Sequence, residues 1–263
     1  MMLSRQELLS GSQDPAGLDA LITLANQVLR TWEPQWSCFL SAPLREEAMQ
    51  RLGALTELQL HADGGRPNAE RQCLLMSRCE SGNTPQDEHP LPVMGLEIEG
   101  NFLFDPVKPH EMRAAVLELG ISEGELGDLW IRGDRGAQML CTPAAAMALH
   151  GRSSQVRDVA IQLEQRPVAS LQPPASRIPK QFTSVEASCR LDAIASAGFG
   201  LSRAKVLNQI RNGRLRLNWQ AVRQASKALN VGDQLQLLDR GSVEVLALER
   251  TKKNRWRVHI ERR

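Results

Sequence analysis

One short stretch constrains the fold more than any other, because residues 189–219 (CRLDAIASAGFGLSRAKVLNQIRNGRLRLNW) place helix, corner and strand signals in a fixed order. Apolar residues recur at helical spacing on both sides of Gly198 and Gly200, which predicts two helices joined at a flexible corner. Ser202 is a suitable N-cap for the second helix, because its hydroxyl can accept a hydrogen bond from a free backbone N–H group. Gly213 is a suitable C-terminal cap. We therefore expect a compact pair of helices here.

A strand follows the two helices, and basic residues surround the unit. Residues 214–218 alternate polar and apolar side chains, which is the period of a half-buried strand with both arginines on its open face. Arg203 and Lys205 lie in the first turn of the second helix, where cations oppose the helix dipole. This unfavourable placement suggests that they serve an anionic partner, although a solvated basic face would look the same. The five cations of the unit are Arg203, Lys205, Arg211, Arg214 and Arg216.

The net charge of +2 hides two regions of opposite sign. From Arg177 onward the chain has 18 Lys and Arg against 7 Asp and Glu, which gives +11, and the preceding residues have 14 against 23, which gives −9. A concentrated positive field attracts polyanions and supplies the sequence-independent part of their affinity. The C-terminal part is therefore predicted to bind nucleic acid, whereas the acidic part would repel it.

An ordered set of motifs in the basic region resembles the S4-type RNA-binding module, first described in ribosomal protein S4. The motifs are Arg190-Leu191-Asp192, Gly198, Ser202-Arg203, Ile210, Gly213, Leu217-Asn218 and Val231-Gly232-Asp233. The resemblance implies a helix-helix-strand (αL) core that binds structured RNA through the second helix and the following corner. The contacts it implies are Ser202, Arg203, Lys205, Arg211, Asn212 and Arg214, to which we add Arg190, Arg216 and Asn218 as candidate RNA-binding residues.

Trp219 departs from the S4-type pattern, because many members have Gly after the Asn. The Asn-Gly hairpin signal is therefore lost, which leaves the geometry of this turn open. A Trp at such a corner can stack on an RNA base or can pack against the corner itself. We include Trp219 among the candidate RNA-binding residues.

Three strands are expected after the motif, at residues 234–238, 243–248 and 256–260, and a basic hairpin tip joins the last two. The tip carries Lys252, Lys253 and Arg255, which we take as further RNA-binding candidates. They can clamp phosphates, or they can serve as charges that prevent pairing of strand edges.

The middle of the chain shows a countable alternation of elements. We expect strands at residues 93–98, 127–132, 137–141 and 155–161, and helices at 110–119 and 143–149. The order βαββαβ is that of the ferredoxin-like split βαβ unit, which many RNA-binding and many unrelated domains share. Trp130 is the only aromatic residue on its central strands, so we do not assign this sheet an RNA-binding face of the RRM type.

The N-terminal part is expected to hold two helices, at residues 17–30 and from about residue 43, and two short strands at 58–61 and 73–76. We therefore predict an α+β, multidomain chain. Its predicted parts are an N-terminal α/β domain at 1–90, a ferredoxin-like middle domain at 91–165 that is expected to bind RNA, a proline-rich linker at 166–181 and an S4-type RNA-binding domain at 182–263.

Three further stretches resemble the YlmH family, including its branch of photosystem II S4-domain proteins. They are residues 39–52, 64–75 and 109–131, and with the basic module the resemblance covers most of the chain. It implies an N-terminal domain, an RNA-binding middle domain and the basic C-terminal module. The family usually has His-Arg where this chain has His110-Glu111, which puts an RNA role of that motif in doubt.

Signatures of catalysis, metal binding and membrane insertion are not found in the sequence. There is no GxGxxG after a strand, the five histidines are scattered, and the five cysteines form no CxxC pair. We expect no catalytic residues, no metal and no cofactor. The start lacks the pattern of a secretory signal and no apolar run could span a bilayer, so we expect a cytoplasmic protein.

The function predicted from the sequence is non-catalytic binding of structured RNA, either rRNA or tRNA, with the ribosome as the partner. The family resemblance, not the spacing of residues, supplies the ribosome. It leaves ribosome quality control and photosystem II-related expression both open as roles. The alternatives are an RNA-modifying enzyme, such as a pseudouridine synthase or an rRNA methyltransferase, and a protein-docking adaptor.

Overall fold

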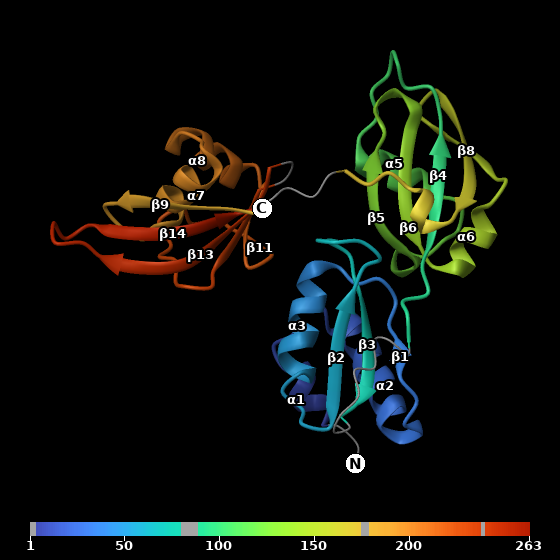
Figure 1. Cartoon of the computed structure of the whole chain (residues 1–263), viewed down its shortest axis with the longest axis horizontal. Helices are drawn as coiled ribbons and strands as arrows, with labels where there is room; N and C mark the ends of the chain where they lie inside the picture. Colours follow the sequence, from blue (N-terminus) through green and yellow to red (C-terminus); the bar gives the residue numbers. More distant parts are fainter. Residues whose placement is uncertain (1–3, 80–88, 175–178, 238–239) are drawn as a thin grey trace. The chain divides into compact units, whose positions relative to one another are not determined.

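A computed structural model describes residues 4–79, 89–174, 179–237 and 240–263. The chain forms two compact units, Met1–Ala175 (unit 1) and Ser176–Arg263 (unit 2), which are described separately. Both units combine helices with antiparallel sheets, so the predicted α+β class is confirmed (Figure 1). Residues 80–88, just before the predicted domain boundary at 90–91, lie outside the described residues. Within the described part, no helix has the length and apolar character needed to cross a bilayer.

The N-terminal part of unit 1 packs helices against a small sheet. The Asp14 carboxylate accepts a 2.9 Å hydrogen bond from the Gly17 N–H and caps the long second helix, which Pro15 begins. The strand order is β1-β3-β2, and the helices bury Leu18, Ile22 and Leu52 in the core. The elements are α1 (Arg5–Leu9), α2 (Pro15–Thr31), β1 (Gln35–Trp36), α3 (Ala42–Leu52), β2 (Leu58–Asp63) and β3 (Cys73–Arg78).

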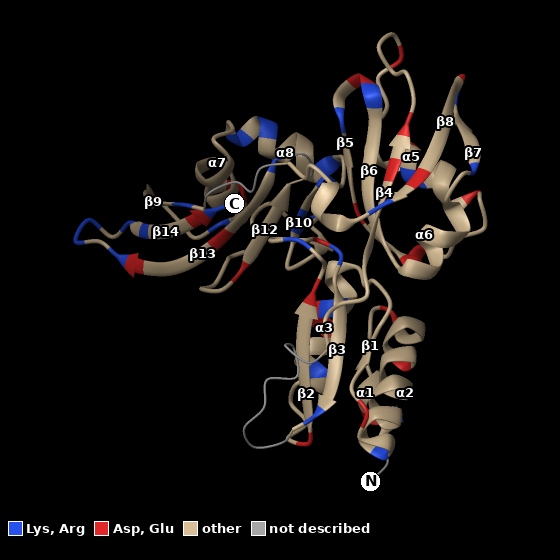
Figure 2. Ribbon diagram, turned by 45° about the vertical axis from the view of Figure 1, so that its right-hand side comes forward, with Lys and Arg blue, Asp and Glu red and all other residues tan. Residues whose placement is uncertain are grey.

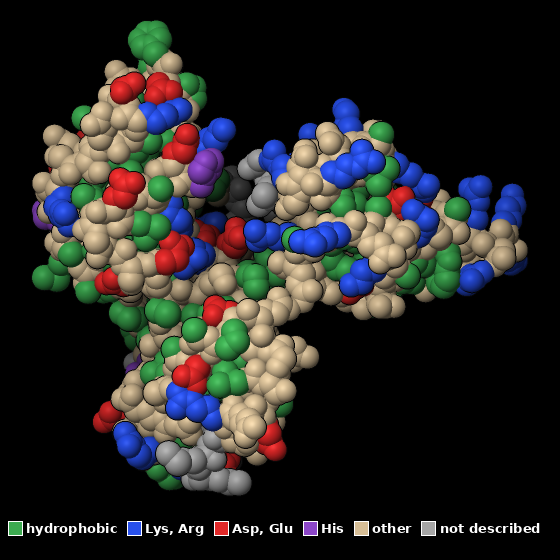
Figure 3. Space-filling view, turned by 180° about the vertical axis from the view of Figure 1, so that it is seen from behind, with side chains coloured by type: hydrophobic (Ala, Val, Ile, Leu, Met, Phe, Trp, Pro, Cys, Tyr) green, Lys and Arg blue, Asp and Glu red, His purple; other side chains and the backbone are tan. Residues whose placement is uncertain are grey.

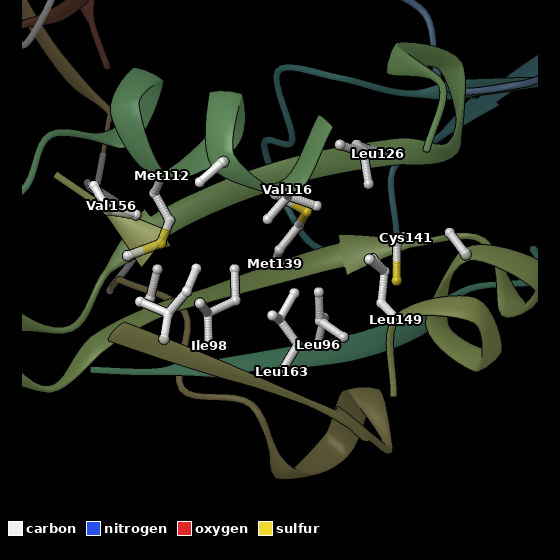
Figure 4. Packing of buried hydrophobic residues seen from close by; sticks show 14 of the residues in the cluster. Leu96, Ile98, Met112, Val116, Leu126, Met139, Cys141, Leu149, Val156 and Leu163 are labelled. Atoms are coloured by element: carbon white, nitrogen blue, oxygen red, sulfur yellow. The ribbon is translucent and has the colours of Figure 1, made fainter. Parts of the chain in front are cut away.

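The second part of unit 1 is a five-stranded antiparallel sheet of order β5-β6-β4-β8-β7. Helices α5 and α6 cover one face, where Met112 and Val116 of α5 lie over Leu96, Ile98 and Met139 of the sheet (Figure 4). Without β7, the strand order is that of the split βαβ unit. The elements are β4 (Met94–Glu99), α5 (Pro109–Leu117), η1 (Glu123–Glu125), β5 (Leu126–Ile131), η2 (Gly133–Arg135), β6 (Gly136–Cys141), α6 (Pro143–Leu149), β7 (Ser153–Val156) and β8 (Val159–Arg166).

The last strand predicted in this part, residues 155–161, is wrong, because these residues span a hairpin. β7 and β8 pair antiparallel, and Val156 lies opposite Val159. The two residues between them form the turn, in which Arg157 has a φ of 53°. Neither turn residue is glycine or asparagine, so the sequence lacked the usual signal of a tight hairpin.

The face of this sheet away from the helices is partly covered by residues 168–172, which follow β8. Leu171 packs with Trp130 and Leu140, and η3 (Val168–Ser170) leads into it. The Trp130 indole N–H donates to the backbone oxygen of Gln172 at 3.0 Å, and the Gln172 N–H donates to Gln138 Oε1 at 2.8 Å. Trp130 is only 8% exposed. Trp130 lies on β5, which is an edge strand of this sheet and not a central strand as the sequence suggested. Its indole N–H is bonded to the chain's own backbone.

A buried carboxylate joins the two parts of unit 1. Asp128 on β5 is 6% exposed and accepts hydrogen bonds from the guanidinium of Arg66, at 2.6 and 3.0 Å, and from the backbone N–H groups of Glu70 and Arg71. The Arg71 guanidinium in turn donates to the backbone oxygen of Leu126 at 2.7 Å. It also donates to the backbone oxygens of Phe39 and Glu123. The β2–β3 loop is therefore fixed onto β5 by charge-assisted hydrogen bonds.

Unit 2 is a six-stranded antiparallel sheet of order β11-β10-β12-β13-β14-β9 with two helices on one face. Gly198 lies within the first helix, α7, and not at the corner, where Gly200 is the C-cap. The lack of a side chain at Gly198 lets the helix approach the sheet, because a Cβ there would come within 2.7 Å of Val243. The edge strand β9 occupies residues that the sequence placed partly in a linker. The elements are β9 (Lys180–Glu186), α7 (Leu191–Phe199), α8 (Arg203–Arg211), β10 (Leu215–Leu217), β11 (Gln220–Ala221), β12 (Gln234–Leu237), β13 (Gly241–Arg250) and β14 (Trp256–Arg262).

Candidate nucleic-acid interface

The start of α7 is fixed by an ion pair within the Arg-Leu-Asp motif. The Arg190 guanidinium donates to both carboxylate oxygens of Asp192, at 3.0 and 3.1 Å, and Asp192 also accepts from the Ala193 N–H. Burial acts to raise the pKa of Asp192, but the hydrogen bond and charge of Arg190 outweigh it, so the net shift of this pKa is downward. Arg190 therefore has a partner inside the fold, although nearly half of its side chain stays exposed.

Helix α8 begins and ends at the caps that the sequence indicates. Ser202 is the N-cap, and its hydroxyl accepts from the Lys205 N–H. At the other end the Gly213 N–H donates to the Ile210 oxygen and the Arg214 N–H donates to the Gln209 oxygen, which is the Schellman pattern. Gly213 has a φ of 66°, as this motif requires. The corner after α8 is thus set by its backbone.

The exposed face of α8 carries three of the predicted contacts, and its first turn lies beside the basic hairpin. The Arg203 guanidinium is 3.4 Å from a carboxylate oxygen of Glu186 on β9. Glu186 pairs in register with Trp256, the residue that follows Arg255 of the hairpin. The structure therefore brings the start of α8 and the root of the hairpin together (Figure 2). We call the exposed cations of these two elements the helix–hairpin surface; they are Arg203, Lys205, Arg211, Lys252, Lys253 and Arg255.

The remaining candidates after α8 lie elsewhere on the unit. Asn212 is the exposed C-cap of α8, and Arg214 begins the corner. Arg216 lies on β10 between Leu215 and Leu217, which are both buried under the helices. Since side chains alternate along a strand, Arg216 lies on the opposite face of the sheet. The structure does not bring Arg216 together with the helix–hairpin surface.

Asn218 and Trp219 form a two-residue hairpin turn between β10 and β11. Their φ values are 47° and 68°, and Leu217 pairs with Gln220, which is the arrangement of a type I′ turn. Trp219 holds a conformation that costs a non-glycine residue about 1–2 kcal/mol. The Asn218 amide donates to Asp233 at 2.8 Å and accepts from the Gln234 N–H. Asn218 therefore builds the turn, and the half-exposed Trp219 is the side chain that this turn presents.

The hairpin tip is ordered by its own contacts and borders a hollow. The Arg250 guanidinium lies 4.6 Å from the centre of the Trp256 ring and donates to the Asn254 side chain. A pocket of about 770 Å³ lies at the root of the tip, beside Val185 of β9. It is lined by Val185, Glu249, Arg250, Thr251, Lys252, Lys253, Arg255 and Arg257. An anionic group entering it would meet five cations and one carboxylate.

The acidic residues of β13 and β14 lie on the sheet face opposite the helices and form ion pairs there. Glu244 and Glu261 pair in register with each other and both contact Arg263, at 3.6 and 2.6 Å. Glu249 is 3.8 Å from Arg257 on the same face. Of these acids, Glu249 also lines the pocket at the hairpin. Figure 3 shows Lys and Arg side chains gathered on unit 2.

Side chains of the types that ligate metals and free cysteine thiols both occur in the described part of the chain. No group of three or more His, Cys, Asp or Glu side chains there could hold a metal ion. All five cysteines are free thiols. Burial raises the pKa of Cys73 and of Cys141 to about 12, so these thiols stay protonated at neutral pH.

Sequence reasoning missed three residues that shape this interface. Glu186 and Val185 lie on an edge strand without a clear apolar alternation, so no pattern placed them beside Arg203 and the hairpin. Asp233 was noted only as part of a motif, whereas its carboxylate binds the Asn218 side chain. The motif itself was the available signal, because an Asn and an Asp at fixed positions can form such a contact across two strands.

The comparisons with known proteins cover both ends of the chain. The family model "YlmH, N-terminal" matches residues 14–81, and the model "Mitochondrial transcription rescue factor 1, C-terminal domain" matches residues 180–261. A curated relative, "Ribosome-associated protein quality control protein P2" of Bacillus subtilis (strain 168), is 24% identical over 221 residues, which are 84% of each chain. The chain is YlmH-like. The solved structure "Cell division protein ylmH from Streptococcus pneumoniae" is also similar, with a TM-score of 0.44 and 17% identity over 60% of this chain and 93% of that one.

The YlmH resemblance read from the sequence is thereby confirmed. In this YlmH-like chain, the first family model spans α2 to β3 and the second spans β9 to β14. The S4-type character of unit 2 and the RNA contacts stay predictions.

Proposed function

We propose that this chain binds structured RNA of the ribosome, either rRNA or tRNA, through phosphate contacts of the helix–hairpin surface, and that it catalyses no reaction itself. The observation that carries the proposal is the set of six exposed cations on α8 and the adjoining hairpin, in a unit of net charge +11. Phosphate contacts from such a surface position an RNA without reading its sequence.

The ribosome is proposed as the partner because of the Bacillus subtilis relative, whose name describes a ribosome-associated quality control protein. This chain matches that relative over 84% of both lengths. We propose the same setting for this chain, in preference to photosystem II-related expression. The acidic unit 1 would not add to the phosphate contacts, because its net charge of −9 repels polyanions.

The first test is the salt dependence of binding. The full chain would be titrated against ribosomes and against a tRNA between about 50 and 300 mM salt. Since each phosphate contact contributes about 0.7–0.9 to the slope of log affinity against log salt, six cations predict a slope of about −4 to −5. A slope near zero would rule out binding through phosphate contacts.

The second test removes two cations of α8 at once. Arg203→Ala with Arg211→Ala should weaken binding about 100-fold or more, because charge-assisted hydrogen bonds are worth about 1.5 kcal/mol or more each. The matched control is Arg263→Ala, on the opposite face of the same unit and paired with Glu244 and Glu261, which should stay within about twofold of the parent. Several RNAs should lose affinity alike, and a loss confined to one RNA would contradict phosphate contacts.

The non-catalytic part of the proposal has its own test. RNA incubated with the full chain would be digested and analysed by mass spectrometry for altered nucleosides. We expect none, with common cosubstrates present or absent. A modified base that depends on the chain would instead favour an RNA-modifying enzyme.

A further inference from the structure

Two consecutive large apolar residues, Leu103 and Phe104, are exposed in the loop that joins β4 to α5 in unit 1. Phe104 is 93% exposed, more than any other large hydrophobic residue of the described chain, and Leu103 beside it is 57% exposed. The loop extends beyond the end of the sheet (Figure 1), and Figure 3 shows hydrophobic side chains at a projecting tip of this unit. Exposed apolar surface of this kind marks contact sites more often than a lone exposed residue does.

Buried core residues lie on both sides of Leu103 and Phe104, the tip of this loop. Phe102 just before it is 1% exposed and Val107 just after it is 8% exposed, and both belong to the core between the sheet and its helices. The Phe102 N–H also donates to the Asp134 oxygen at 2.8 Å. The exposed pair is therefore fixed in position by residues that cannot leave the core without loss of stability.

Arg157 from the β7–β8 turn fastens the base of the same loop. Its guanidinium donates to the backbone oxygens of Asp105 and Pro106, at 3.1 and 3.0 Å, and pairs with the Asp105 carboxylate at 3.0 Å. It also lies 3.7 Å from Glu111 of α5. A tip that is braced in this way loses little conformational entropy on binding, which favours its use as a contact.

The charges around the tip decide what it can contact. Residues 91–175, the part of unit 1 that carries the loop, hold 11 Asp and Glu against 7 Lys and Arg, and Arg157 at the base of the loop is paired with Asp105 and Glu111. Beside Asn101 of the loop, three carboxylates share a hollow with three arginines, and the net charge of residues 91–175 is −4; the six side chains are those of Glu97, Glu99, Asp134, Arg132, Arg135 and Arg166. Insertion between bases would bring these carboxylates close to phosphates, which is unfavourable. An apolar pocket rimmed by Lys and Arg on a protein complements both the side chains and the charge.

We propose that Leu103 and Phe104 dock into an apolar pocket, rimmed by basic residues, on a protein of the ribosome. The inference rests on the proposed function, because it places the partner in the same assembly. Unit 2 would then supply the contact with RNA and this loop the contact with protein.

The test uses the full chain bound to ribosomes, with Phe104→p-benzoylphenylalanine as a photo-reactive probe. We expect an adduct with a protein whose crosslinked peptide lies near Lys and Arg residues. The control is Met147→p-benzoylphenylalanine on α6, which is 75% exposed on the same unit and should give no such adduct. An adduct with rRNA alone, no adduct, or the same adduct from both positions would overturn the inference.

A second variant separates this inference from the proposed function. Phe104→Ser should leave folding and tRNA binding unchanged, because the side chain is exposed and lies in unit 1, but it should weaken ribosome binding about tenfold. Equal ribosome binding by the variant and the parent would overturn the inference alone, whereas a parent that binds neither ribosomes nor tRNA would overturn the proposed function and this inference with it. A dimer of the parent that the variant abolishes would assign the loop to a second copy instead.

Discussion

The five-stranded sheet of unit 1 and the six-stranded sheet of unit 2 share a layout and differ in their charge. Each is antiparallel and carries two helices on one face. Unit 1 has a net charge of −9 and its other sheet face is partly covered by residues 168–172, whereas unit 2 has a net charge of +11. The layout of helices on a sheet thus does not determine the partner, and the surface charges must be examined separately.

The arginines of the two units show the same difference at the level of single side chains. In unit 1, Arg66 and Arg71 donate to a buried carboxylate and to backbone oxygens, so their charges are used inside the fold. In unit 2, Arg211 and Arg255 are exposed. Arg66 and Arg71 therefore hold unit 1 together, whereas Arg211 and Arg255 present their charges to solvent, as Arg203 does in part beside Glu186.

The largest effect is expected where an arginine of unit 1 loses its partner. Asp128→Ala leaves the mostly buried Arg66 without its carboxylate, and we expect the free energy of unfolding of unit 1 to fall by about 3 kcal/mol. Hydrogen exchange measured by mass spectrometry should show the loss of protection in unit 1 only, since the pair lies wholly within it. Asp134→Ala, which removes an exposed acid of the same unit, serves as the control. Equal loss of protection in both units would contradict their independence.

A smaller effect is expected from the ion pair of unit 2, and it depends on pH. The pKa of Asp192 is lowered in the folded chain, so its ionised form contributes stability that is present above the ordinary carboxyl pKa of about 3.8 and is lost as the pH falls through the lowered value. Because Arg190 is half exposed, Asp192→Asn should cost about 1 kcal/mol at pH 7.

The measurement for Asp192 is denaturant unfolding of unit 2 from pH 7 to pH 2. The difference between the parent and Asp192→Asn should shrink as the pH falls below about 4. A difference that stays constant over this range would show that the charge of Asp192 does not carry the effect.

The smallest effect concerns the single acid beside the helix–hairpin surface. Glu186→Gln removes the negative charge 3.4 Å from Arg203, and we expect RNA binding to tighten by about two- to threefold. Glu244→Gln on the opposite sheet face is the matched control and should change affinity less. If both variants tighten binding equally, the net charge of unit 2 and not the position of Arg203 determines the affinity.

Local signals predicted much of this structure, and long-range contacts account for what they missed. Ser202 and Gly213 bound α8 as expected, because a cap depends on neighbouring backbone groups only. Edge strand β9 was missed, since a strand exposed at the edge lacks a clear apolar alternation. The contact of Leu171 with Trp130 joins residues 41 apart in the chain, and no pattern in either segment could have indicated it.

The candidate site was predictable in kind but not in detail. The cations of α8 follow from the helical spacing, and the structure places them on an exposed face. The internal roles of Arg190 and Asn218 depend on Asp192 and Asp233, whose distances the sequence does not give. Their contacts with RNA stay predictions, as do those of the other candidates.

The contact between Trp130 and Gln172 also provides an optical signal. An indole that is shielded from water and bonded through its N–H emits at a shorter wavelength than a hydrated one, so release of residues 168–172 would shift the fluorescence of Trp130 to the red. With the other four tryptophans replaced by phenylalanine, the emission of a single unlabelled residue would report whether this sheet face opens when the chain meets a ribosome.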